Sequence, residues 1–372
     1  MKKIGREVLF LNTSEESSRI GESTFARLGD GSILFAYTNF CEGSGHDHGG
    51  ARLDARISRD DGETWGEPFV LLEKDAKAQN YMSPGFVRMS DGRLGIIYDR
   101  KSKTESGGLL CMPYFRTSSD DGKTWSEQVC CLENDGYYVY VNDSAVCLSG
   151  GRIVVPISHC GTGDYKYFGG EVFFAYSDDN GKTWQKTENI KSPYADNIGL
   201  QEPGIYEFDG GVLWSWMRTA YGFQYQSFSR DGGKTWSAPV PNFRFPSPDS
   251  PMRIKKVGKY LVSVFNPLPY NCMSSCTESW LSPKRTPLAI TFDGTDGKIF
   301  SATGNTASGK DAYDFNKNVF LLEDDFSESY CYPAICEVRD GFLVAYYHSG
   351  GTDMCLSCTK MVKVKFDEAG LI

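Results

Sequence analysis

One short phrase, Ser-x-Asp-x-Gly-x-Thr-Trp, occurs four times in this chain. Its copies begin at Ser58, Ser118, Ser177 and Ser229, so the phrase recurs about every 52 to 60 residues. Its Asp side chain can accept bonds from backbone N–H groups two residues on, and its Gly can take a positive φ, so together they close a tight turn. We expect the Trp to begin the next strand as a large apolar wedge. Strand-like runs such as residues 172–176 lie upstream, so each phrase is predicted to join two antiparallel strands.

A second repeat sets the number of units. A turn followed by an apolar strand occurs six times, beginning at Leu28, Met89, Leu148, Phe208, Val257 and Val338. Each unit has room for about four strands. We therefore predict an all-β fold, a six-bladed β-propeller with four-stranded antiparallel blades, in which a single domain spans residues 1–372. The N-terminal strand around Val8 to Leu11 is expected to complete the last blade.

Composition limits the partners and the compartment. The chain has 39 Lys and Arg against 48 Asp and Glu, and its net charge of -9 argues against a nucleic-acid binder. No stretch approaches the ~20 apolar residues of a membrane span, so no membrane partner is expected. The N-terminal apolar run is too short for a signal peptide, so we expect a cytoplasmic protein.

The twelve cysteines are expected to be reduced thiols. Two pairs, Cys272 with Cys276 and Cys355 with Cys358, have a spacing that resembles metal ligands. No second Cys pair or His pair follows at zinc-finger spacing. We therefore expect buried strand cysteines and neither a metal nor a cofactor.

The repeated phrase resembles the Asp box of the sialidase (neuraminidase) superfamily, and the resemblance runs over essentially the whole chain. In that family three arginines bind the carboxylate of the substrate. The resemblance implies that Arg19 is the first, in Arg19-Ile-Gly21, where Gly replaces the family's Pro. Arg218 matches the second arginine. Arg285 matches the third, and Arg253 is a weaker rival.

The resemblance also implies three catalytic residues. The general acid falls on Asp47 in a Gly/His loop before the first Asp box, and Asp54 is the competing assignment. Glu202 matches a Glu that the family places across a turn from its second arginine. The nucleophile is a Tyr in the last blade, for which Tyr332 is preferred over Tyr330.

These residue types suit one chemistry. Planar guanidinium groups match a carboxylate bidentately, so three arginines favour a 2-keto sugar acid. A Tyr with an ordinary pKa near 10 needs a base, and Glu202 is expected to supply it. Asp47 would protonate the leaving oxygen and later activate water, which gives net retention. The implied function is a retaining exo-glycosidase that removes terminal sialic acid from an acidic glycan.

Two departures from the family leave the substrate open. Many sialidases contact the 4-hydroxyl with an Arg and an Asp, and neither charge occurs in the corresponding residues 37–40 and 81–84. Another nonulosonic acid or a uronate, taken by a hydrolase or lyase, is therefore an alternative substrate. A non-catalytic sugar-binding propeller is the third hypothesis.

Overall fold

The computed structural model describes residues 1–371 apart from 161–169, 194–198, 270–284, 303–317 and 352–355. Within these residues every regular element is a β-strand. The described part of the chain contains no helix with the length and apolar character to span a membrane. Cys272, Cys276 and Cys355, which carry the metal-like spacings of the sequence, lie outside the described residues.

Hydrogen bonding groups the described strands into five sheets. The largest has eight strands: β2 (Arg19–Arg27), β3 (Ile33–Glu42), β4 (Gly50–Ser58), β5 (Phe69–Leu72), β6 (Ala78–Arg88), β7 (Leu94–Lys103), β8 (Leu109–Ser118) and β9 (Val129–Cys130). The next has five: β10 (Tyr138–Tyr140), β11 (Val146–Cys147), β12 (Ile153–His159), β13 (Glu171–Ser177) and β14 (Gln185–Lys186).

Three sheets have four strands each. One contains β15 (Gln201–Glu207), β16 (Leu213–Arg218), β17 (Phe223–Ser229) and β18 (Val240–Pro246). Another contains β19 (Arg253–Val257), β20 (Tyr260–Phe265), β21 (Leu288–Gly294) and β22 (Phe320–Glu323). The last contains β23 (Tyr330–Val338), β24 (Gly341–His348), β25 (Cys358–Lys365) and β1 (Arg6–Leu11).

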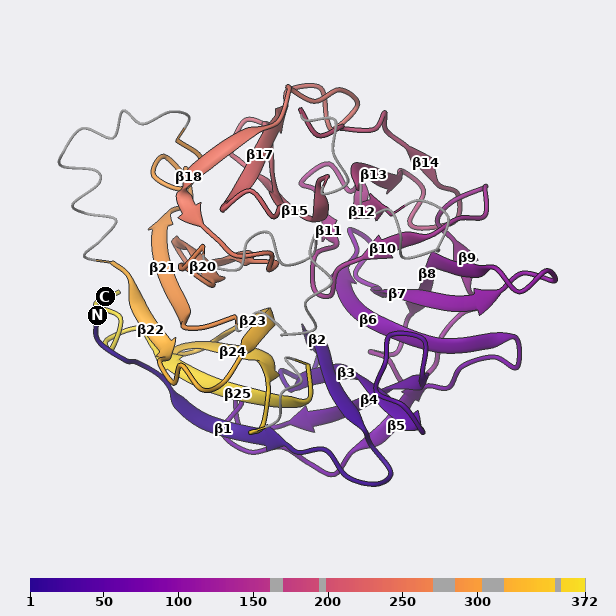
Figure 1. Ribbon diagram of the computed structural model, residues 1–372, viewed down its shortest axis with the longest axis horizontal. Helices are drawn as coiled ribbons and strands as arrows, with labels where there is room; N and C mark the ends of the chain where they lie inside the picture. The colour runs from indigo at the N-terminus through magenta and orange to yellow at the C-terminus, as the bar shows by residue number, and fades with distance from the viewer. Residues whose placement is uncertain (161–169, 194–198, 270–284, 303–317, 352–355, 372) are drawn as a thin grey trace.

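The sheets are set in a ring around a common centre, as Figure 1 shows, so the all-β, propeller-like arrangement is confirmed. The pairing does not show six separate four-stranded sheets. One sheet has eight strands because a parallel pair, Ala51 with Asn80, joins β4 to β6. The Asn80 side chain bonds backbone carbonyls of the loop that precedes β4, which holds the start of β6 beside the start of β4.

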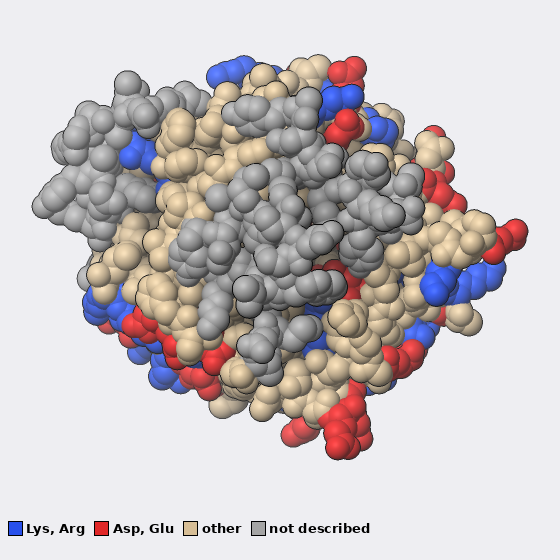
Figure 2. Space-filling model, viewed as in Figure 1, with Lys and Arg blue, Asp and Glu red and all other residues tan. Residues whose placement is uncertain are grey.

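The N-terminal strand closes the ring. β1 pairs antiparallel with β25, with Leu11 opposite Thr359, so the prediction that residues Val8 to Leu11 complete the last sheet is confirmed. The two ends of the chain lie together at the edge of the ring (Figure 1). From the same side, basic and acidic side chains are interspersed around the rim (Figure 2).

The four Asp-box phrases form the predicted turns between antiparallel strands. In the second copy Asp120 accepts bonds from Ser118 Oγ at 2.7 Å and from the Thr124 backbone N–H at 2.9 Å. The prediction that the Trp begins the next strand is wrong, because the Trp lies in the connection before that strand. Trp125 precedes β9 in the irregular connection, where it stacks on Phe86 beside the apolar cluster between β2–β5 and β6–β9.

The strand registers place the Asp boxes at one end of the ring and the start of each inner strand at the other. Arg19, the first residue of β2, pairs with Phe40 near the end of β3. Ile33, the first residue of β3, pairs with Ser58, where the first box begins. Residues at the start of the inner strands therefore lie opposite the boxes.

Asp143 connects strands of different sheets at the centre of the ring. It lies between β10 and β11, two short strands that both pair with β12 along the inner edge of their sheet. Asp143 is 2% exposed. Its carboxylate accepts bonds from Thr24 Oγ1 at 2.8 Å, Lys255 Nζ at 2.6 Å and the Ile335 backbone N–H at 3.2 Å. One side chain thus ties together β2, β19 and β23.

Replacing Asp143 with Ala should lower the free energy of unfolding by roughly 2 to 4 kcal/mol, because a buried hydroxyl, a backbone N–H and a half-buried ammonium lose their acceptor. Urea unfolding of the wild type and Asp143→Ala measures this loss. Asp135→Ala, at an exposed position just before β10, is the matched control and should change stability little. Equal midpoints for the two variants would show that Asp143 does not bind the sheets together.

Candidate active site

A cavity of about 250 Å³ lies where the inner strands meet, at the end of the ring opposite the Asp boxes. Residues from four of the five sheets and from five connections between strands line it. The lining includes all six site residues that the sequence predicts, namely Arg19, Asp47, Glu202, Arg218, Arg285 and Tyr332. Positions more than 300 residues apart in the chain therefore share one cavity.

Four inner strands carry the same local distortion at the cavity. The pairing register shifts within β2, β6, β15 and β23, and each bulge contains one non-glycine residue with a positive φ. These residues are Glu22 (50°), Ser83 (54°), Glu202 (43°) and Tyr332 (53°). Such a conformation costs on the order of 1 to 3 kcal/mol, and a bulge redirects a side chain. Each bulge aims a polar group into the cavity.

Tyr332 of β23 and Glu202 of β15 are in direct contact across the cavity. The Tyr332 hydroxyl donates to Glu202 Oε1 at 2.6 Å, and Arg218 Nη1 donates to Glu202 Oε2 at 2.7 Å. Arg218 Nη1 also reaches the Tyr332 oxygen at 3.3 Å, and its Nε donates to Asp249 Oδ1 at 2.6 Å. A phenol, a carboxylate and a guanidinium thus form one hydrogen-bonded triangle.

This environment sets the protonation of the phenol. Burial, together with the Glu202 carboxylate, raises the pKa of Tyr332 well above its usual value, while Arg218 and Arg285 oppose the shift. Tyr332 is therefore a neutral phenol near neutral pH. The bonded Glu202 oxygen is placed to accept its proton if the phenol oxygen becomes a nucleophile.

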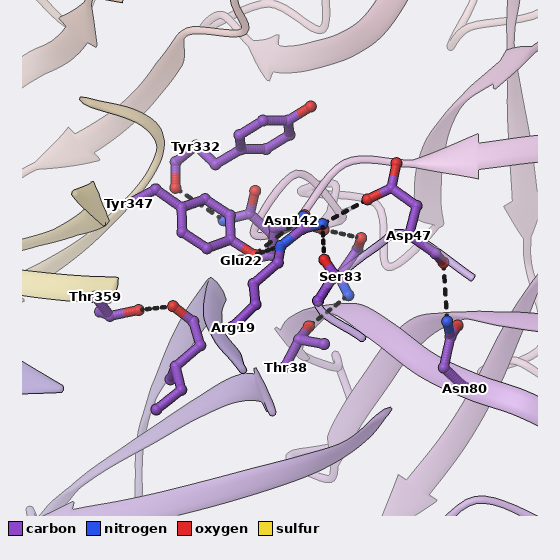
Figure 3. Close-up of polar contacts among 12 residues, drawn as sticks. Arg19, Glu22, Thr38, Asp47, Asn80, Ser83, Asn142, Tyr332, Tyr347 and Thr359 are labelled. Atoms are coloured by element: carbon purple, nitrogen blue, oxygen red, sulfur yellow. Dashed lines mark hydrogen bonds and ion pairs between the residues drawn. The ribbon is translucent and has the colours of Figure 1, made fainter. Parts of the chain in front are cut away.

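All three guanidinium nitrogens of Arg19 donate hydrogen bonds (Figure 3). Its Nε donates to Tyr347 Oη at 2.7 Å, Nη2 to Glu22 Oε1 at 2.6 Å and Nη1 to Asp47 Oδ1 at 2.5 Å. The guanidinium carbon lies 4.6 Å from the centroid of the Phe40 ring. The side chain is 3% exposed, so this arginine is rigidly held.

Asp47 lies at the mouth of the cavity, in the loop between β3 and β4. Its side chain remains 44% exposed although one oxygen bonds Arg19. Burial of the carboxyl would raise its pKa, but Lys101 and Arg19 outweigh that effect and lower the pKa of Asp47 well below its usual value. Asp47 is therefore ionised near neutral pH.

Arg285 reaches the cavity from the connection that leads into β21. Its guanidinium carbon lies 5.6 Å from the centroid of the Tyr332 ring. Its backbone carbonyl accepts a bond from the Tyr330 N–H at 2.9 Å, which fixes this connection to β23. The three predicted arginines therefore line the same cavity from β2, from β16 and from the connection into β21.

The three rival residues lie outside the lining of this cavity. Asp54 is buried in β4, where it accepts bonds from Asn39 Nδ2 at 2.7 Å and Arg52 Nε at 2.8 Å. Arg253 is buried in β19 and donates to the Asn142 carbonyl. Tyr330 packs in the apolar cluster between the last two sheets.

Sequence reasoning misses three charged residues of the cavity: Glu22, Asp99 and Lys101. Glu22 bonds Arg19, and Asp99 and Lys101 lie two residues apart on β7. Burial raises the pKa of Asp99 well above its usual value, which favours its neutral form. A signal for the bulges does exist: Ser83-Pro84-Gly85, Glu202-Pro203-Gly204 and Tyr332-Pro333-Ala334 share a residue-Pro-small pattern.

The arrangement can bind an anion and move protons beside it. Three guanidinium groups match a carboxylate, and their charge is partly balanced by Glu22, Glu202 and Asp47. The Tyr332 and Glu202 pair can generate a nucleophile, and Asp47 can exchange a proton with solvent at the mouth. Among the described residues no group of His, Cys, Asp and Glu has the arrangement of a metal site.

Comparison with known proteins gives a consistent family. A family model described as a BNR repeat-like domain matches residues 25–345. A sialidase of Paraclostridium sordellii is 26% identical over 234 residues, which cover 56% of this chain and 55% of that protein. A sialidase of Clostridium perfringens is 28% identical over 208 residues, covering 47% of this chain and 54% of that protein. The chain thus matches about half the length of these curated relatives.

A solved structure has the same fold over nearly the whole chain. The intramolecular trans-sialidase from Ruminococcus gnavus, in complex with oseltamivir carboxylate, superposes with a TM-score of 0.70. The match covers 97% of both chains at 15% identity. At that identity the likeness concerns the fold.

Gly21 stands where the sialidase superfamily has a proline, and the packing around Arg19 requires a glycine there. A Cβ at this position would lie 1.9 Å from Tyr347 Cε1. Gly21→Ala should therefore push the Tyr347 ring off Arg19 Nε, destabilise the fold by roughly 1 to 3 kcal/mol and weaken the binding of a carboxylate ligand. Urea unfolding and calorimetric titration measure both effects. Gly150→Ala, whose Cβ would meet nothing within 4 Å, is the control, and equal behaviour of the two variants would contradict the prediction.

Proposed function

Because the chain belongs to the BNR repeat-like family of the sialidase superfamily, we propose that it is a retaining exo-glycosidase that releases terminal sialic acid, or a related 2-keto sugar acid, from glycans. The observation that carries the proposal is the 2.6 Å contact between Tyr332 and Glu202 in a cavity lined by three arginines. A phenol paired with a base suits attack on an anomeric carbon that bears a carboxylate, since a neutral nucleophile avoids charge repulsion.

The substrate carboxylate would bind Arg19, Arg218 and Arg285. Asp47 bonds Arg19 Nη1, so a substrate carboxylate would compete with Asp47 for the same guanidinium. Binding of substrate would release Asp47 and weaken the interaction that keeps it ionised. The released carboxyl could then take a proton and act as the general acid.

The covalent step would proceed through Tyr332. Its phenol oxygen forms a bond to the anomeric carbon while its proton passes to Glu202 and the bond to the leaving oxygen breaks. Asp47 gives its proton to that leaving oxygen. In the second step Asp47 takes a proton from water, the water oxygen replaces Tyr332, and Glu202 returns the proton to the phenol, with net retention.

The structural likeness to an intramolecular trans-sialidase favours a second candidate function. In an intramolecular transfer a hydroxyl of the same sugar, in place of water, displaces Tyr332 and yields an anhydro sugar. The same residues would carry out the first step. A uronate-type hydrolase or lyase and a non-catalytic sugar-binding propeller remain the other outcomes of the activity test.

We also propose that the ring counts as six blades. The eight-stranded sheet divides into β2–β5 and β6–β9, and each half repeats the strand order of the four-stranded sheets. The Ala51 and Asn80 pair is the parallel link between the halves. A blade boundary at this link gives two four-stranded blades, which together with the four other sheets make the six blades expected from the sequence repeats.

The purified protein should cleave a fluorogenic α-sialoside without added metal. Fluorescence measures the rate, and NMR or mass spectrometry of the sugar distinguishes hydrolysis from intramolecular transfer, since the anhydro product lacks one water. A matched fluorogenic uronide is the comparison substrate. Turnover of the uronide alone would reject the sialidase proposal, and turnover of neither would favour the non-catalytic hypothesis.

Tyr332→Phe should lower kcat by roughly a thousandfold or more while leaving the affinity for a sialic acid analogue nearly unchanged, because the hydroxyl acts only in the reaction. Tyr330→Phe is the matched control, since this hydroxyl contacts the Asp325 carbonyl at 3.4 Å outside the cavity lining. Steady-state kinetics and calorimetric titration give the two quantities. Comparable losses in both variants would remove Tyr332 from the nucleophile role.

A further inference from the structure

Lys101 is a buried cation of the cavity to which neither the sequence patterns nor the family resemblance gives a role. It lies in β7, is 3% exposed and lines the same cavity as the three arginines. Its Nζ donates to the backbone carbonyl of Asp47 at 3.0 Å and lies 5.8 Å from the centroid of the Tyr137 ring. Burying an ammonium group is costly, so its position requires a compensating contact.

That contact belongs to a clamp on the loop of Asp47. Asn80 Nδ2 donates to the carbonyls of Asp47 and Gly49, both at 2.9 Å, and Lys101 shares the Asp47 carbonyl. Figure 3 shows Asn80 on the backbone side of Asp47 and Arg19 on the carboxylate side. Two residues of β6 and β7 therefore hold the backbone from which the Asp47 carboxyl projects.

Two carboxyl groups, Asp47 and Asp99, raise the pKa of Lys101, and the contribution of Asp47 is the larger. Asp99 lies two residues away on β7, but burial raises its pKa and favours its neutral form. The charge of Lys101 therefore interacts most strongly with Asp47, which contributes more than any other group to the raised pKa of Lys101. This interaction does not involve the guanidinium that a substrate carboxylate would occupy.

We propose that Lys101 is a positioning residue for Asp47: its ammonium group holds the Asp47 carbonyl, and so keeps the carboxyl at the cavity mouth when a substrate carboxylate has taken Arg19. This inference rests on the proposed function, in which Asp47 is the general acid. A substrate carboxylate would displace the Asp47 carboxyl from Arg19, whereas the Lys101 contact is made to the Asp47 backbone and would persist.

The charged and titratable groups that face Asp47 come from three elements. They are Arg19 and Glu22 from β2 and Lys101 from β7, and the titratable His48 of its own loop is kept neutral because burial and Lys101 lower its pKa to about 4. Removal of the Lys101 charge makes ionisation of Asp47 less favourable, so Asp47 holds its proton to a higher pH. The alkaline limb of the kcat profile, which reports a general acid, should therefore move to higher pH in both Lys101→Met and Lys101→Gln.

The kinetic test compares two leaving groups. Lys101→Met should lower kcat on a natural sialoside by roughly tenfold to a hundredfold, but on an aryl sialoside with an acidic phenol by less than about threefold, because the latter needs little protonation. Lys101→Gln, whose amide can donate to the same carbonyl, should recover part of the loss. Lys103→Met, an exposed lysine of the same strand, is the control. Equal losses on both substrates, or no recovery in Lys101→Gln, would overturn the proposal.

Hydrogen exchange tests the clamp without catalysis. The Gly49 N–H, which donates to the His46 carbonyl at 2.6 Å, should exchange faster in Lys101→Met than in the wild type and Lys103→Met. Unchanged exchange would refute the clamp even in an active enzyme. If the wild type cleaves no sialoside, the proposed function fails, while the exchange rates still decide whether Lys101 holds the loop.

Discussion

The carboxylate of Asp143 joins β2, β19 and β23 at the centre of the ring. Backbone pairing holds the strands of each sheet together and apolar clusters pack neighbouring groups of strands against one another. The inner strands that meet at the axis also need polar contacts. Asp143 supplies them, since its carboxylate is shared by Thr24, Lys255 and the backbone of Ile335. Asn142 beside it donates to the Ser23 carbonyl at 2.8 Å. These contacts fix how closely the inner strands approach, and hence the width of the cavity above them.

Strained bulges convert that fixed frame into a site. A regular inner strand would alternate its side chains between the two faces of its sheet. Glu22, Ser83, Glu202 and Tyr332 instead adopt a positive φ at register shifts, and all four line the cavity. The strain is tolerated because the pairing on both sides of each bulge is maintained. Fold and site are therefore coupled, since a change in one inner strand moves a group in the cavity.

Shared charges define how the site can respond to a ligand. Arg19 is divided between Glu22, Tyr347 and Asp47, and Arg218 between Glu202, Tyr332 and Asp249. Anionic partners keep these guanidinium groups in place without a ligand, so little side-chain ordering is left for binding. The exposed partner, Asp47, is the one that a ligand can displace. The cavity thus combines anchored guanidinium groups with a half-exposed carboxyl, that of Asp47, at its mouth.

The sequence by itself determined the elements whose physics is local. An Asp box closes a turn through contacts within a few residues, so its repeats predict antiparallel strands and a propeller-like ring. The family resemblance then selected Arg19, Glu202 and Tyr332, which the structure brings to one cavity. The tertiary structure alone shows that two groups of strands join into one eight-stranded sheet. It alone shows that Glu22 bonds Arg19 and that Lys101 bonds the Asp47 carbonyl. A charged residue gains such contacts through burial and through partners from distant strands, and no local pattern in the chain encodes either.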